Sequence, residues 1–180
     1  MIVSDQRKQS LFIIVYPGKE TAEGVYHTLR ELEKQDKIDI KTAATLYRTE
    51  QGKLLLKRRQ RLTLWKDEFD VGCIGLIMAG TRAGGLAGTL IDALIDQRRS
   101  FKLCEVKTLL DDKLGPDDSG LVILMDNADW EAIQNDVGLT GEKLTVELKV
   151  KAEKKLAEIA ADKEVAAAVQ EEVQIEKVTL

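Results

Sequence analysis

Few residues of this 180-residue chain are of types that commonly carry catalysis or metal binding. The chain has one histidine, His27, and two cysteines, Cys73 and Cys104. These three side chains cannot supply the four ligands of a structural zinc site, and a serine-type relay would have to use His27. His27 lies among polar neighbours, which favours a surface position. The two cysteines do not form a disulfide framework of the kind found in secreted proteins.

Phosphate-binding and calcium-binding motifs are incomplete. Residues 17–19 read Pro-Gly-Lys after an apolar run, but the first glycine and the Ser or Thr of a phosphate-binding loop are missing. Asp117, Asp118, Asp126 and Asp129 do not have the spacing of an EF-hand loop, and turns and helix caps account for them. We therefore expect no enzyme activity, no cofactor and no metal site.

The composition is that of an ordinary folded domain. Lys and Arg number 27 and Asp and Glu 31, which gives a net charge of -4. This balance argues against a surface built for nucleic acid, so we expect no nucleic-acid partner. Residues 1–10 are polar and lack the apolar core of a signal peptide, which favours a cytoplasmic location.

The most distinctive segment is rich in small residues. Residues 71–91 contain a single charge, Arg82, and glycine recurs every four residues at 80, 84 and 88, with alanine at 79, 83 and 87. On a helix these positions share one face that has almost no side chains. We predict a helix over residues 71–96, with the spacing of a glycine zipper. The candidate interaction residues are Gly80, Arg82, Ala83, Gly84, Ala87 and Gly88.

Two interpretations of this segment remain open. Glycine costs a helix up to about 1 kcal/mol relative to alanine, so its repeated use indicates a close contact with another backbone. The first interpretation is association with another helix, between chains or within a membrane, with Arg82 pairing to set the register. The second is a glycine-rich loop, or a helix packed tightly on the chain's own sheet. Arg82 in the middle of the segment argues against a membrane-spanning helix.

A basic run precedes this segment. Its candidate contacts with an anionic surface are Lys57, Arg58, Arg59 and Arg61. Clustered cations next to an apolar segment are attracted to anionic lipid headgroups. The alternative is a solvated edge strand that its charges protect from aggregation.

The order of the expected elements indicates the fold class. The predicted strands cover residues 10–16, 38–47, 53–57, 119–125 and 143–150, and the predicted helices cover 20–35, 101–114 and 130–137. A split βαβ order of this kind favours an α+β ferredoxin-like sandwich with a glycine-rich helical insert. We expect a disordered or extended N-terminus over residues 1–9, the ferredoxin-like domain over 10–150, and an Ala/Glu/Lys-rich helical tail over 151–180 that ends in strand-like residues.

Short stretches of the chain resemble a bacterial family. They lie at residues 11–15, 20–23, 29–33, 38–40 and 114–124. These stretches are similar to the family known as domain of unknown function twelve-sixty-nine, whose members are often labelled predicted membrane proteins because of a glycine-rich apolar middle. The resemblance implies a ferredoxin-like α+β core with a small-residue helical insert and no established catalytic residues. The shorter, less apolar middle and the tail after residue 150 depart from that family and favour a soluble assembly.

These observations lead to one functional expectation with two alternatives. We expect a non-catalytic interaction or assembly protein that forms a homo-oligomer, or docks into a larger complex, through the small-residue helix. The first alternative is a peripheral membrane-associated protein that binds anionic lipid through the basic run and the apolar helix. The second is a small-ligand regulatory domain, because ferredoxin-like folds host many functions.

Overall fold

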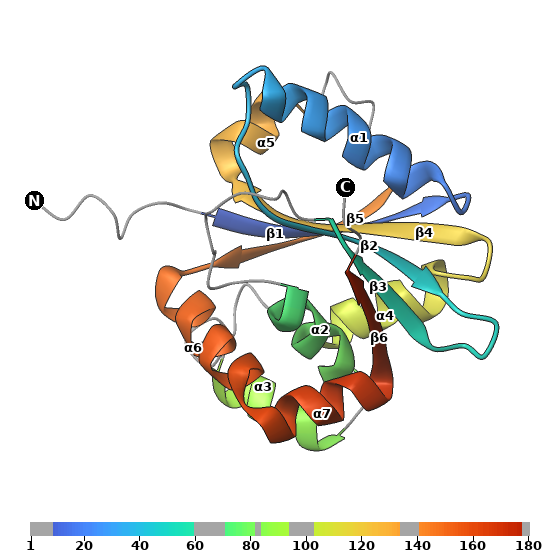
Figure 1. Ribbon diagram of the computed structural model, residues 1–180, viewed down its shortest axis with the longest axis vertical. Coiled ribbons are helices and arrows are strands. Elements are labelled where there is room, and N and C mark those ends of the chain that lie inside the picture. Colours follow the sequence, from blue (N-terminus) through green and yellow to red (C-terminus); the bar gives the residue numbers. More distant parts are fainter. Residues whose placement is uncertain (1–8, 60–70, 82–83, 94–102, 134–140, 178–180) are drawn as a thin grey trace, which may run out of the picture.

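The two most apolar runs of the chain form the central strands of a sheet. In the computed structural model, which describes residues 9–59, 71–81, 84–93, 103–133 and 141–177, β1 (Gln9–Pro17) pairs antiparallel with β4 (Asp118–Asp126). Seven consecutive residues of each strand are buried, because helices cover both faces of the sheet (Figure 1).

Four further strands complete a six-stranded sheet in the order β5-β1-β4-β2-β3-β6. They are β2 (Ile40–Arg48), β3 (Leu54–Arg58), β5 (Glu142–Leu148) and β6 (Val173–Lys177). Neighbouring strands are antiparallel except β3 and β6, which run parallel, so the sheet is mixed and open. The α+β prediction is thereby confirmed, and the five predicted strands lie where the sequence pattern placed them, with small shifts at their ends.

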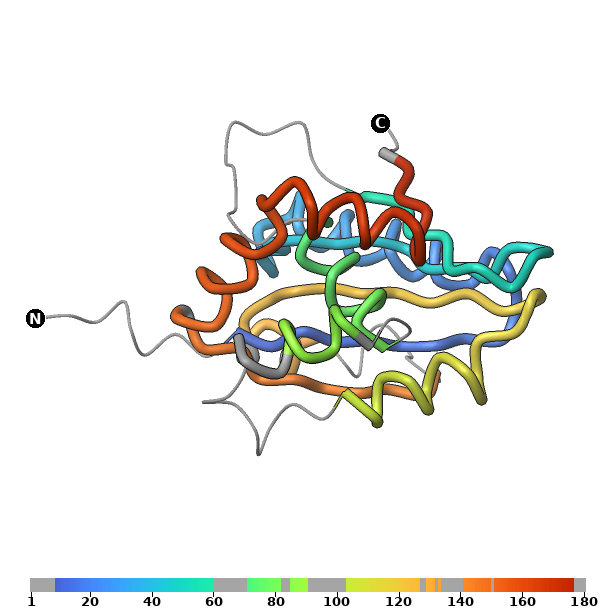
Figure 2. Tube along the Cα trace, turned by 90° about the horizontal axis from the view of Figure 1, so that it is seen from below, coloured from blue at the N-terminus to red at the C-terminus, as the bar shows by residue number. Residues whose placement is uncertain are grey.

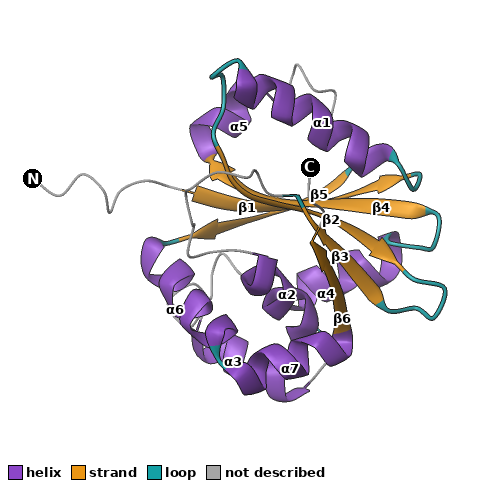
Figure 3. Cartoon of the chain, in the orientation of Figure 1, coloured by secondary structure: helices purple, strands orange, loops and turns teal. Residues whose placement is uncertain are grey.

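One face of the sheet is covered by two of the described helices (Figure 3). They are α1 (Thr21–Lys34), which follows β1, and α5 (Asn127–Ile133), which follows β4. Ala22 and Leu29 of α1 are fully buried, as their helical spacing predicts, and Tyr26 between them is buried as well. The rings of Phe12 and Trp130 stack with centroids 4.2 Å apart, which holds α5 on the sheet.

The other face is covered by five further helices of the described residues. They are α2 (Val71–Gly80), α3 (Gly84–Ala93), α4 (Leu103–Lys113), α6 (Val150–Ala161) and α7 (Lys163–Glu172). Figure 2 shows α2 in the middle of this layer, with α4 toward the β5 edge of the sheet and α7 toward the β6 edge. Nine of the ten residues of α2 are buried, so the surrounding elements cover an almost wholly apolar segment. Among the described residues, no helix is long and apolar enough to span a bilayer.

The prediction of one helix over residues 71–96 is wrong. Its sequence forms two helices, α2 and α3, that pack against each other. A methyl group on Gly80 would lie 2.8 Å from Cδ2 of Leu90, whereas residues ten apart on a straight helix are separated by about 15 Å. The amide and hydroxyl of Thr81 both donate to the carbonyl of Met78, which closes α2 in a turn.

The C-terminal segment lies within the layers of the domain. Helices α6 and α7 contribute the buried residues Ala152, Leu156 and Val169 to the same core as α2. The strand-like residues at the end of the chain form β6, which pairs in parallel with β3 and buries Val173 completely. The sheet thus gains its last strand from the segment that was expected to form a tail.

Candidate interaction site

The structure separates the predicted interaction residues. Gly80 lies at the buried end of α2, whereas Gly84, Ala87 and Gly88 belong to α3. Arg82 and Ala83 lie outside the described residues. The small residues therefore lie on two helices, and the environment of the glycines differs between α2 and α3.

Gly75 and Gly80 of α2 are in contact with the chain's own side chains. A methyl group on Gly75 would lie 2.9 Å from Cδ1 of Ile175 and 3.2 Å from Cγ1 of Val169. Gly80 lies against Leu90 in the same way. These glycines of α2 therefore pack tightly against other parts of the same chain.

The glycines of α3 have a different environment. Leu86 and Leu90 point into the core, with exposed fractions of 7% and 0%. Gly85 and Gly88 are exposed on the outer side of the helix, and outside the backbone of α3 itself no heavy atom of the described residues lies within 4 Å of a methyl group built on either. Ala87 is half-buried and lies on the flank of the helix. We call the exposed surface at Gly85 and Gly88 the outer face of α3.

Gly75 and Gly85 were not among the predicted interaction residues. The predicted residues follow a strict four-residue glycine repeat, and both glycines fall outside it. Gly85 and Gly88 are three positions apart, which also places two residues on one side of a helix. Glycine spacings of three and four residues, taken together, indicate the outer face of α3.

The basic run is dispersed by the fold. Lys57 lies on β3 with its ammonium group 5.2 Å above the ring centre of Tyr47. Arg58 is half-buried, and Arg61 lies outside the described residues. Arg59 was a candidate for contact with an anionic surface, but only 5% of it is exposed. The run therefore does not present a continuous row of exposed cations over its described part.

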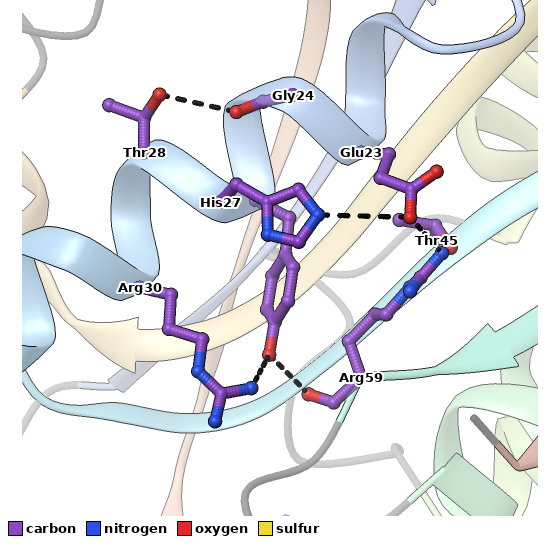
Figure 4. A network of polar contacts seen from close by, with 8 residues as sticks. Glu23, Gly24, His27, Thr28, Arg30, Thr45 and Arg59 are labelled. Atoms are coloured by element: carbon purple, nitrogen blue, oxygen red, sulfur yellow. Dashed lines mark hydrogen bonds and ion pairs between the residues drawn. The ribbon is translucent and has the colours of Figure 1, made fainter. Parts of the chain in front are cut away.

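Arg59 is held by a carboxylate from the first helix (Figure 4). Its Nη2 lies 2.9 Å from Oε1 of Glu23, and its Nε donates to the hydroxyl of Thr45 at 3.3 Å. A buried guanidinium needs such partners, because removing its charge from water is costly. The pair stabilises the contact between α1 and the end of β3, and it removes Arg59 from the candidate lipid-binding residues.

A tyrosine on the same helix adds a second link. The Tyr26 hydroxyl donates to the carbonyl of Arg59 at 3.1 Å, and Nη1 of Arg30 donates to that hydroxyl at 3.5 Å. Burial raises the pKa of Tyr26 above its ordinary value, and the nearby Arg30 partly opposes this. The hydroxyl therefore stays protonated and acts as a donor to the backbone, which is a structural role.

The histidine and the two cysteines lie on three different helices, α1, α2 and α4. His27 is on the surface of α1, as predicted, with its Nε2 3.8 Å from Oε1 of Glu23. Cys73 is buried and Cys104 is exposed, and both are free thiols. Over the described ranges, no group of three or more His, Cys, Asp or Glu side chains is arranged to hold a metal ion.

Comparisons with family models, with curated proteins and with solved structures found no match to this chain. The resemblance to the bacterial family described above therefore stays a prediction. The most distinctive feature of the candidate site is the outer face of α3, where Gly85 and Gly88 are exposed.

Proposed function

We propose that the chain is a non-catalytic self-associating protein, in which the outer face of α3 lies against α3 of a second copy. One observation carries the proposal: Gly85 and Gly88 are exposed, with no described heavy atom within 4 Å of a methyl group on either. A surface of this shape allows another helix backbone to approach closely.

The cost of glycine supports this function. Each glycine in a helix interior is less favourable than alanine by up to about 1 kcal/mol. At Gly75 and Gly80 contacts with side chains of the same chain offset that cost. The described part of the chain offers no such contact to Gly85 or Gly88. We therefore infer that a partner molecule makes the contact that offsets the cost of these two glycines.

A second copy is the partner that fits best. Residues 84–91 carry no charge, so two copies of α3 can meet without electrostatic repulsion. A two-fold contact brings the same small-residue surface from both chains together, which is the commonest arrangement among soluble homo-oligomers. The contact would be short and stabilised mainly by packing.

We also infer that the fold is ferredoxin-like at its centre. In the order β5-β1-β4-β2, strand β4 lies between β1 and β2, and β1 lies between β4 and β5. Helix α1 connects β1 to β2, and α5 connects β4 to β5, on the same face of the sheet. This double split βαβ arrangement supports the sequence-based proposal, with β3, β6 and the second helical layer as additions.

Substitution of Gly88 by leucine tests the function. A leucine side chain on the outer face of α3 should prevent the close approach, so Gly88→Leu should lower the native mass measured by light scattering. The control is Gly24→Leu, because Gly24 is an exposed glycine of α1 that is likewise clear of described heavy atoms within 4 Å.

The control should keep the wild-type mass, and circular dichroism should show both variants to be folded. A wild-type protein that is monomeric up to high concentration, or a Gly88→Leu variant with unchanged mass, would refute the proposed α3 contact.

A further inference from the structure

Strand β5 forms one edge of the sheet. It pairs with β1 on one side, and no other strand of the described chain pairs with its opposite side. Figure 2 shows this edge next to α4. An unpaired edge presents a row of backbone donors and acceptors that another strand can bind.

The side chains of β5 alternate between the two faces of the sheet. Leu144, Val146 and Leu148 belong to the core beneath the five helices, although Leu144 is only half-buried. Lys143, Thr145 and Glu147 alternate with them and are exposed on the other face.

The sequence of β5 is complementary to itself in one antiparallel register. If Thr145 faces Thr145 of a second copy, Lys143 lies opposite Glu147 of that copy, and the same pair forms again on the other side of the axis. Leu144 then lies opposite Val146, also twice. A shift of two residues in either direction loses both charge pairs, so this register is favoured over its neighbours.

A groove beside the edge provides a second reason for a partner. It has a volume of about 340 Å³ and lies between α4 and β5, with the half-buried side chains of Leu109 and Leu144 in its lining. The Lys113 ammonium group lies 3.9 Å from a carboxylate oxygen of Glu142 in the same lining. A strand added at this edge would cover Leu144 from the side and would remove apolar surface from water.

We propose that β5 pairs antiparallel with β5 of a second copy of this chain, about a two-fold axis at Thr145. The pairing joins two six-stranded sheets into one continuous sheet. It uses a different surface from the outer face of α3 and does not depend on that contact.

Disulfide trapping tests the register. In the proposed dimer, the two Thr145 Cα atoms are about 4.5–5.5 Å apart, which is within the range that a disulfide bridges. Thr145→Cys, made together with Cys104→Ser to remove the exposed native thiol, should form a two-chain disulfide in high yield under mild oxidation. The buried Cys73 can be left in place.

Matched variants control for random collisions. Lys143→Cys in the same background should not cross-link with itself, because its two copies would be about 13 Å apart along the strands. A mixture of Lys143→Cys and Glu147→Cys chains should cross-link, because these positions face each other. Equal cross-linking of Thr145→Cys and Lys143→Cys, or the absence of cross-linking at Thr145→Cys, would overturn the proposal.

Charge exchange and the α3 variant separate the two contacts. Lys143→Glu should lower the cross-linking yield at Thr145→Cys at least fivefold, and Glu147→Lys added to it should restore the yield. Gly88→Leu should leave the yield unchanged, whether or not the α3 contact exists. A yield that falls with Gly88→Leu and is insensitive to Lys143→Glu would contradict the β5 pairing.

Discussion

Tyr16 is buried at the end of β1 with a hydroxyl group that has no hydrogen-bond partner among the described residues. Burial raises the pKa of this tyrosine far above its ordinary value, because the ionised form would be poorly solvated. The ring belongs to the core beneath α1 and α5, so its apolar part stabilises the fold while its hydroxyl group does not.

Removing this hydroxyl should stabilise the protein. We expect Tyr16→Phe to raise the free energy of unfolding at pH 7 by about 1 kcal/mol, because the folded state no longer contains an unpaired buried polar group. Urea unfolding followed by circular dichroism measures the change. A loss of stability would show instead that the hydroxyl is hydrogen-bonded in solution.

The same variant should change the response to alkaline pH. Below the ordinary tyrosine pKa of about 10, Tyr16 is neutral in both the folded and unfolded states. As the pH rises above that value, the unfolded chain ionises while the folded chain does not, and stability is lost. Tyr16→Phe should reduce this loss, and the remainder should include Tyr26, whose pKa is also raised.

At the scale of elements, the C-terminal strand provides a test of how the last segment is held. Val173 of β6 is fully buried against β3 and the core of the helical layer, whereas its neighbour Gln174 is exposed. We expect Val173→Ala to lower the free energy of unfolding by about 2 kcal/mol, because it leaves a cavity in the core. The expected change for Gln174→Ala is within about 0.5 kcal/mol.

Chemical unfolding of the two variants measures both values. If the two substitutions cost the same small amount, β6 does not dock on β3 in solution. A large cost at Val173 alone would establish that the segment after residue 150 contributes to the stability of the domain.

Helices α2 and α3 are both rich in glycine, but their glycines have different environments. Gly75 and Gly80 of α2 allow the side chains of Ile175, Val169 and Leu90 to approach the helix closely. This close approach allows the apolar helix α2 to pack against several neighbouring elements. Gly85 and Gly88 on α3 have no such neighbours among the described residues. Helical periodicity is the same in both cases, so only the packing distinguishes them.

At the scale of the whole molecule, the two proposed contacts predict an assembly larger than a dimer. Each contact joins two copies through identical surfaces, and a chain that has both contacts links to two neighbours. We expect the wild-type mass to exceed that of two chains. Gly88→Leu or Lys143→Glu alone should limit the protein to two chains, and the two together should give single chains.

Sedimentation over a range of concentrations measures these masses. Gly24→Leu provides the control, because it changes an exposed helical glycine on the opposite face of the sheet. A wild-type mass of two chains at every concentration would exclude one of the two contacts, and the single variants would identify which one.

Local sequence pattern was sufficient for much of the architecture. The apolar runs at residues 10–16 and 119–125 predicted the two buried strands, and the helix predicted over residues 20–35 corresponds to α1. Turn residues next to these segments indicated where each strand or helix ends. These features depend on neighbours within a few positions, so a periodic pattern is enough to reveal them.

Other features were decided only when distant parts of the chain came together. The sequence predicted that Arg59 is one of several exposed cations. In the structure it is buried and pairs with Glu23 of α1. The fold-back of α3 on α2 and the addition of β6 to β3 likewise depend on contacts such as Gly80 with Leu90. Burial and pairing between distant residues depend on three-dimensional packing, which local periodicity does not encode.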